Sequence, residues 1–213
     1  MATTPAGTSL PLRGVVGGVA LLAVVGGFAI GLPKVDSGPD GGASVAALPD
    51  SLPSGLVAVD TLQSGPFVSQ IDVVALRDVE VRAVSALDDF YDSSSAYRLY
   101  GRADGSALGA VTVIGRAPGP FPGDALPIAA TDPANTARPS ALVQRVGAAI
   151  CEITWGQAVP AGQTPDPTQL PQQVRCQQGT DQTVQFSVAG LTLAEVEQVL
   201  AALPGGEGSA QDQ

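Results

Sequence analysis

The chain has 213 residues, with ten Lys and Arg, twenty Asp and Glu and no His, and its formal net charge is −10. A chain this acidic is expected to repel nucleic acid and anionic lipid headgroups, because both are bound through Lys and Arg. The absence of His excludes His-based catalytic triads, His-ligated zinc or haem, and the usual general base near neutral pH.

An uncharged apolar stretch covers residues 14–32, between Arg13 and Lys34. About twenty apolar residues, each rising about 1.5 Å along a helix, cross a hydrocarbon core about 30 Å thick. The stretch therefore predicts a transmembrane helix. A cleaved signal peptide is the alternative, since Ala29, Ile30 and Gly31 form a small-x-small site. Gly14/Gly18 and Gly27/Gly31 are G-x-x-x-G pairs, which let two such helices approach closely.

The flanks of this stretch predict its orientation. Residues 1–13 are too short to fold and are expected to form a cytoplasmic leader, which makes the protein a single-pass protein of the cell membrane. All twenty acidic and nine of the ten basic residues follow the stretch, so that part carries a net charge of −11. It is expected to lie outside the cytoplasm.

The next residues, 33–55, are rich in Pro, Gly, Ser and Asp and predict a flexible linker. A domain is expected over 56–203, beginning with a short strand at 56–62. Residues 75–92 show apolar spacing typical of a helix, although 79–83 also alternate as a strand would. Segments 96–101 and 107–114 flank Asp104 and Gly105, which predicts a β-hairpin.

Strand patterns return further along. Residues 142–155 have β character, with Ala149, Cys151, Ile153 and Trp155 on one face. Segments 174–178 and 183–189 predict a second hairpin. Residues 192–203 predict a helix with a capping box and an apolar stripe, and 204–213 are expected to form a disordered tail.

Two proline-rich segments, 116–140 and 156–173, interrupt these elements. Proline blocks both helix and strand pairing, and long irregular loops in compact domains are either functional or disordered. We therefore expect these loops to form a binding surface, with Phe121 and Leu126 as candidate interaction residues. Disordered spacers are the alternative.

Few residues point to chemistry. The two cysteines, Cys151 and Cys176, predict a disulfide, because an even count outside the cytoplasm favours one. Asp36/Asp40 and Asp88/Asp89/Asp92 match no metal-binding spacing and are interpreted as solvated charge. No catalytic, metal-binding or cofactor-binding residue is predicted, and no cofactor is expected.

The C-terminal third consists of a strand ending CEITW, a C-x-x-G-T hairpin with TVQFSVAGL, and a capped helix; RLYGRADG lies further upstream. These features resemble the extracytoplasmic domains of uncharacterised single-pass actinobacterial membrane proteins. More distantly, they resemble the outer domains of membrane-anchored anti-sigma regulators. The cytoplasmic sigma-binding helices of such regulators are missing here, which argues against that activity.

Together these patterns predict an α+β protein with one N-terminal transmembrane helix, a flexible linker, and a small antiparallel β-sheet domain with a C-terminal helix packed on it. The expected function is a non-catalytic binding or accessory module with a protein partner in the membrane or envelope. Two alternatives stay open. One is an envelope-acting enzyme that uses Asp/Glu chemistry, and the other is a secreted protein.

Overall fold

The structure, a computed structural model, describes residues 44–45, 47–65, 68, 71–125, 127 and 134–205. The predicted leader, the predicted transmembrane helix at 14–32 and residues 206–213 of the predicted tail lie outside the described residues. No helix among the described residues is long and apolar enough to span a membrane.

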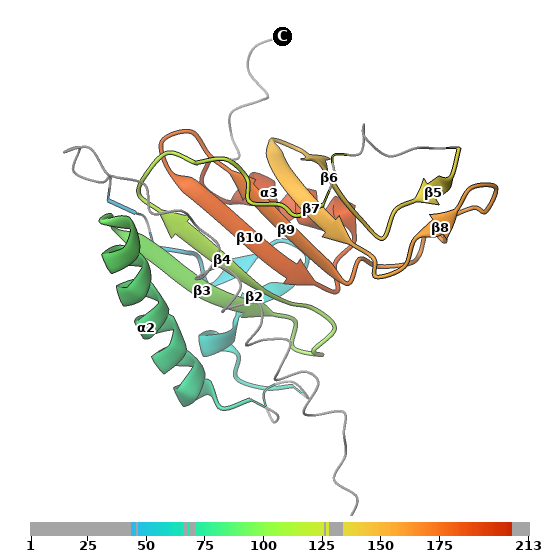
Figure 1. The fold of residues 1–213 in the computed structure, drawn as a ribbon. Helices are drawn as coiled ribbons and strands as arrows, with labels where there is room; N and C mark the ends of the chain where they lie inside the picture. The colour runs from blue at the N-terminus through green and yellow to red at the C-terminus, as the bar shows by residue number, and fades with distance from the viewer. Residues whose placement is uncertain are drawn as a thin grey trace, which may run out of the picture. The chain divides into compact units, whose positions relative to one another are not determined.

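The fold is α+β, built on an eight-stranded antiparallel sheet (Figure 1). The strand order is β1-β2-β3-β4-β10-β9-β7-β6, and a separate pair joins β5 to β8. The strands are β1 (Ser51–Leu52), β2 (Leu56–Ala58), β3 (Ser95–Gly101), β4 (Leu108–Ile114), β5 (Thr136–Arg138), β6 (Ala141–Val146), β7 (Ala149–Thr154), β8 (Val159–Pro160), β9 (Gln173–Gln178) and β10 (Thr183–Ala189); the helices are η1 (Val59–Thr61), α2 (Val73–Tyr91) and α3 (Leu193–Ala202).

Both predicted hairpins are present. β3 pairs with β4 and β9 pairs with β10, each antiparallel. Gly105 takes a φ of 75° in the first turn, a left-handed conformation that glycine adopts without steric cost. Strands β4 and β10 then pair along seven residues and join the two hairpins at the centre of the sheet.

The main core lies on the sheet face covered by α3. Strand alternation places Val184, Phe186 and Val188 of β10 on this face. The inward stripe of α3, which includes Val196 and Val199, belongs to the same buried cluster. The predicted C-terminal helix packed on an antiparallel sheet is therefore confirmed.

The capping box predicted for this helix is also present. The Thr192 hydroxyl accepts a hydrogen bond from the Glu195 amide at 3.3 Å, and Glu195 Oε2 accepts one from the Thr192 amide at 2.8 Å. Glu195 also forms an ion pair with Arg102. The hydrogen bond from the Thr192 amide, together with the contacts from Arg102, lowers the pKa of the Glu195 carboxyl.

Helix α2 covers β3 and β4 on the opposite face of the sheet (Figure 1). The Asp72 carboxylate caps it by accepting hydrogen bonds from the amides of Val74 and Ala75, both at 3.1 Å. Leu76 packs against Leu99 and Ala110 in a second, smaller core cluster. The helix predicted at 75–92 is thus confirmed, although no residue of α2 is fully buried.

Two predicted boundaries differ from the structure. Residues 142–155 form two strands, β6 and β7, because the chain turns at Gly147, which has a φ of 57°. The second half of the predicted linker, 33–55, belongs to the domain, since Leu48 and Leu52 lie in the main core. The proline and glycine content of this segment predicted a linker. Burial of the Leu48 and Leu52 side chains in the core stabilises the folded position of the segment despite that composition.

Candidate functional site

A polar surface lies on the face of β10, β9 and β7 that is opposite the main core. Its side chains alternate with the core residues of the same strands. Polar groups are costly to bury without hydrogen bonds, so each needs a partner on a neighbouring strand, as for Gln185 and Ser187, or in a segment above the sheet. Its buried polar members, each at most 9% exposed, are Glu152, Gln177, Thr183, Gln185 and Ser187.

Residues 116–125, which we call the strap, supply some of these matching groups. The Gln177 side-chain amide donates to the Gly119 carbonyl at 2.8 Å, and the Thr183 hydroxyl donates to the Arg116 carbonyl at 2.9 Å. The strap contains three prolines, which lack an amide hydrogen, so its carbonyls are its main hydrogen-bonding groups. Side-chain donors on the sheet, such as those of Gln177 and Thr183, can therefore pair with the carbonyls of the strap.

Glu152 fastens the far end of the strap. One carboxylate oxygen accepts hydrogen bonds from the amides of Asp124 and Ala125, at 3.1 and 2.9 Å. The other oxygen accepts one from Arg175 at 3.2 Å. Hydrogen bonds to an ionised carboxylate are stronger than neutral ones. The first part of the predicted 116–140 loop is therefore attached to the sheet.

The two candidate interaction residues of that loop have different outcomes. Phe121 is half-buried, and a Cβ on Gly123 would lie only 2.6 Å from its Cε1 atom and 3.1 Å from Val143. Phe121 therefore packs within its own loop next to β6. Leu126 lies outside the described residues.

The second part of the first loop and the whole of the second loop meet each other. Strand β5 comes from the first loop and β8 from the second, and they pair antiparallel. We call residues 134–140 and 156–172 the arm. It extends beyond β6 and β7 at the edge of the fold (Figure 1). Sequence reasoning expected the two loops to form one surface, and it did not predict the pairing of β5 with β8.

Contacts at the base hold the arm to the sheet. The Arg138 guanidinium lies 4.9 Å from the centre of the Trp155 ring and donates a hydrogen bond to the Gln169 side chain at 2.6 Å. The Gln172 amide donates to the Thr154 carbonyl at 2.7 Å. These contacts bridge both loops and β7, so the base of the arm is attached to the sheet.

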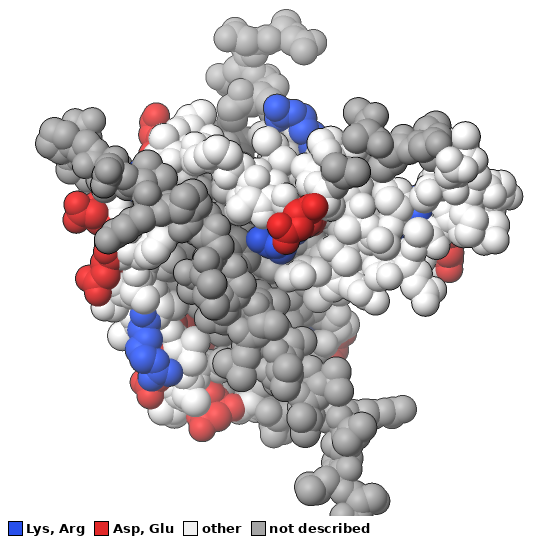
Figure 2. Space-filling model, in the orientation of Figure 1, with Lys and Arg blue, Asp and Glu red and all other residues white. Residues whose placement is uncertain are grey.

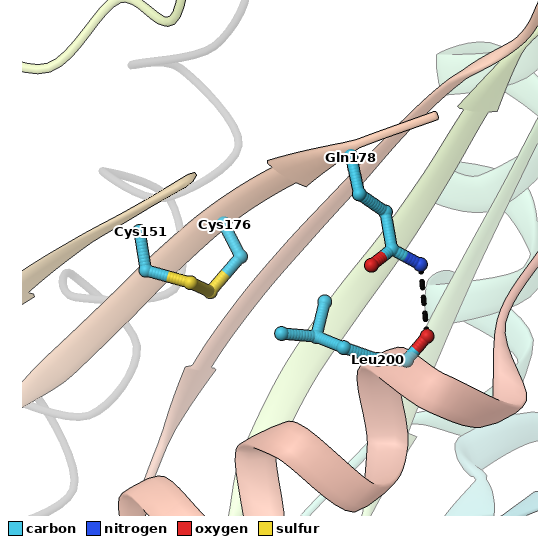
Figure 3. Close-up of a disulfide and its surroundings, with 4 residues drawn as sticks. All are labelled: Cys151, Cys176, Gln178 and Leu200. Carbon is cyan, nitrogen blue, oxygen red and sulfur yellow. Dashed lines mark hydrogen bonds between the residues drawn. A yellow bond between two sulfur atoms is a disulfide. The ribbon is translucent and has the colours of Figure 1, made fainter. Parts of the chain in front are cut away.

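The Cys151–Cys176 disulfide lies beneath these segments and is confirmed. The two residues are directly opposite each other on β7 and β9, with their Cα atoms 4.0 Å apart (Figure 3). Gln178 on β9 donates to the Leu200 carbonyl of α3 at 2.8 Å. The strands that carry the arm and receive the strap are thus joined to one another and to α3.

Charge is distributed unevenly over the molecule. Residues 44–125 contain ten acidic and five basic residues, whereas the arm contains only Arg138 and Asp166. Few coloured atoms lie over the arm at the right of Figure 2. The arm is therefore an almost uncharged, solvent-exposed part of an acidic molecule.

Carboxylates near α2 bear on the enzyme alternative. Burial raises the pKa of Glu80, and nearby Asp60 raises it further. However, Glu80 Oε1 accepts the Leu99 amide at 2.8 Å, and the Asp60 carboxylate pairs with Arg98 at 3.1 Å. Burial, assisted by Glu80, also raises the pKa of Tyr97 to about 12. These contacts account for both carboxylates without a substrate, because each fastens a neighbouring element to β3.

Among the described residues, no group of His, Cys, Asp or Glu is arranged to hold a metal ion.

Sequence reasoning missed Glu152 as the residue that holds the strap. A signal was present, because Glu152 is the only acidic residue in the strands that the structure describes, but alternation suggested that it faced solvent.

No protein-family model, curated protein or solved structure matches this chain. The resemblance to actinobacterial membrane proteins therefore stays a prediction, and function has to be argued from the site.

Proposed function

We propose that this chain is a single-pass, membrane-anchored accessory module that binds a protein partner of the membrane or envelope through its arm. The observation that carries the proposal is the pairing of β5 with β8, which joins two proline-rich loops into one projection. A pre-ordered surface loses less conformational freedom when a partner docks than a free loop does.

The composition of the arm supports binding rather than catalysis. Its exposed residues are mostly Ala, Gly, Pro, Gln and Thr, which offer backbone and side-chain hydrogen bonds but no acid–base group near neutral pH. The disulfide fits an oxidising compartment, as expected for a domain outside the cytoplasm.

An arm variant tests this proposal. Replacing residues 162–167 with two glycines shortens the tip and leaves Arg138, Trp155 and Gln169 in place. Proteins cross-linked to the full chain in intact membranes are recovered and identified by mass spectrometry. A partner recovered with the native chain is expected to be lost with the arm variant.

The matched control changes exposed apolar residues elsewhere. Val74 and Val81 on α2 are 71% and 70% exposed, so the double change to Ser is expected to keep the fold and removes the two most exposed large apolar side chains of α2. This variant is expected to retain the partner. Retention by the arm variant, or equal loss in both variants, would contradict the assignment to the arm.

The location is tested separately. Protease added to intact cells without a wall is expected to digest the domain and spare the leader. Protection of the domain would contradict the proposed orientation, whereas a mature N-terminus close to Leu32 would support the signal-peptide alternative.

A further inference from the structure

The base of the arm holds a positively charged side chain whose hydrogen bonds are incomplete. The Arg138 guanidinium lies over the Trp155 ring, 4.9 Å from its centre. Its Nη2 atom donates to Gln169 Oε1 at 2.6 Å, but its Nε atom is buried and has no acceptor. Among the described residues, no other arginine has a buried nitrogen without an acceptor. A buried donor without a partner is costly, most of all on a charged group, so this edge of Arg138 favours a further acceptor.

The geometry of the guanidinium indicates which acceptor fits. The Nε and Nη2 atoms lie on the same edge of the planar group, and their hydrogens point in the same direction. A carboxylate accepts both hydrogens with its two oxygens, whereas the Gln169 amide oxygen accepts only the one from Nη2. Gln169 is exposed, so its side chain can turn into solvent without loss of core packing. A carboxylate can therefore take its place.

We propose that this edge of Arg138 binds a carboxylate presented by the partner of the arm; the inference rests on the proposed function. Charge favours a carboxylate over a phosphate, which carries about −1.5 to −2 at neutral pH. The chain has a net charge of −10, and Arg138 is the only basic residue of the arm. A second negative charge on the ligand would therefore meet repulsion without a second cation to offset it.

The groups around this edge are held in place by the fold. The Trp155 amide donates to the Ser140 carbonyl at 2.8 Å, and the Trp155 side chain is only 8% exposed. Arg138 lies on β5, where it is opposite Val159 of β8. Because the ring and the guanidinium are both positioned by these contacts, less freedom is lost when a carboxylate binds.

Asp166, the acidic residue of the arm, is the competing acceptor within the chain. In the described part of the chain it forms no ion pair with Arg138. Instead, Asp166 Oδ1 accepts hydrogen bonds from the Thr168 amide and hydroxyl, at 2.8 and 2.7 Å. These two bonds hold the Asp166 carboxylate in its own turn, which leaves the Arg138 edge to an external ligand.

Acetate is the probe for this site, and Trp155, the only tryptophan of the chain, is the reporter. Acetate replaces chloride around the full chain in detergent micelles, so the ionic strength stays constant. We expect a saturable change in Trp155 fluorescence and movement of the Arg138 Nε–H resonance in isotope-labelled protein. Arg138→Gln should weaken acetate binding at least about tenfold. Arg138→Lys should also weaken it, because lysine keeps the charge but lacks the two-donor edge.

The matched control is Arg145→Gln, which removes the same charge from an exposed position on β6. It should bind acetate as the native chain does. A stationary Arg138 Nε–H resonance, or equal weakening by Arg145→Gln, overturns the site. Tighter binding of inorganic phosphate than of acetate overturns the carboxylate as the ligand class. An Arg138 Nε–H resonance that moves in Asp166→Asn before acetate is added identifies Asp166 as the acceptor and also overturns the proposal.

Two model compounds distinguish the possible sources of the carboxylate. N-acetyl-trialanine presents a chain terminus, and aspartate blocked at both ends presents a side chain. The compound that binds more tightly identifies the source, and binding of neither overturns a protein carboxylate as the ligand.

The partner-recovery experiment separates this inference from the proposed function. Arg138→Gln is expected to lose the partner that Arg145→Gln retains. A partner that is retained by Arg138→Gln but lost by the shortened arm variant overturns the carboxylate site and leaves the arm as the binding surface. Retention of the partner by both the Arg138→Gln and the shortened arm variants overturns the proposed function itself.

Discussion

Replacing Glu152 with Ala removes the acceptor that holds the far end of the strap. Two amide hydrogen bonds and one contact with Arg175 are lost. Hydrogen bonds to a charged group contribute about 1.5–3 kcal/mol each, but the freed amides and the partly exposed Arg175 regain water. We therefore expect the free energy of opening the strap to fall by about 2 kcal/mol in total. This corresponds to a roughly 30-fold larger opening equilibrium constant, and to equally faster amide exchange when reclosing is faster than exchange.

Hydrogen exchange of the Asp124 and Ala125 amides measures this opening directly. Glu152→Ala is expected to lose protection at these amides and to keep it in β4 and β10. Glu197→Ala is the control, because Glu197 is exposed on α3. Unchanged protection at 124–125 would refute the role of Glu152 in holding the strap. An equal loss across the whole sheet would show that Glu152 supports the fold rather than the strap.

Three further outcomes are expected. Changing Cys151 and Cys176 to Ser should lower the free energy of unfolding by about 3.5 kcal/mol in denaturant titrations, from loop closure over a separation of 25 residues; an unchanged midpoint would contradict this. Gly109→Ala should lower the free energy of unfolding by about 1–3 kcal/mol in the same titrations, since its Cβ would lie 2.6 Å from a β10 carbonyl oxygen. Gly119→Ala, whose Cβ would meet nothing within 4 Å, should leave it almost unchanged. The folded-state pKa of Glu195 lies below its ordinary value of 4.5. The ionised carboxylate therefore stabilises the fold above pH 4.5, and this contribution is lost as the pH falls through the folded-state pKa. Over that pH range, Glu195→Gln should lose less stability than the native chain.

Local signals predicted the elements that depend on neighbouring residues. The capping box of Thr192 and Glu195 marks the start of α3, and Asp104 with Gly105 marks the β3–β4 turn. These signals succeed because capping and turn formation involve residues only a few positions apart. The break at Gly147 was missed because β6 and β7 continue the same apolar pattern on either side of it.

The candidate site depends on contacts between distant residues. Glu152 reaches amides 27 and 28 residues away, and the Gln177 side chain reaches a carbonyl 58 residues away. No periodicity within a strand indicates that its outward polar side chains will be covered by another segment. The loops could therefore be recognised as unusual from their prolines, but their attachment could not be predicted.

The sequence by itself determined the acidic charge, the uncharged stretch at 14–32, the α+β class and the pairing of the only two cysteines. Each follows from composition or from a short-range pattern. Tertiary structure alone decided that the strap lies on the polar surface and that β5 pairs with β8. The strap attaches there because the sheet order brings β7, β9 and β10 side by side, and their buried polar groups take hydrogen-bond partners from neighbouring strands and from the segment that crosses them.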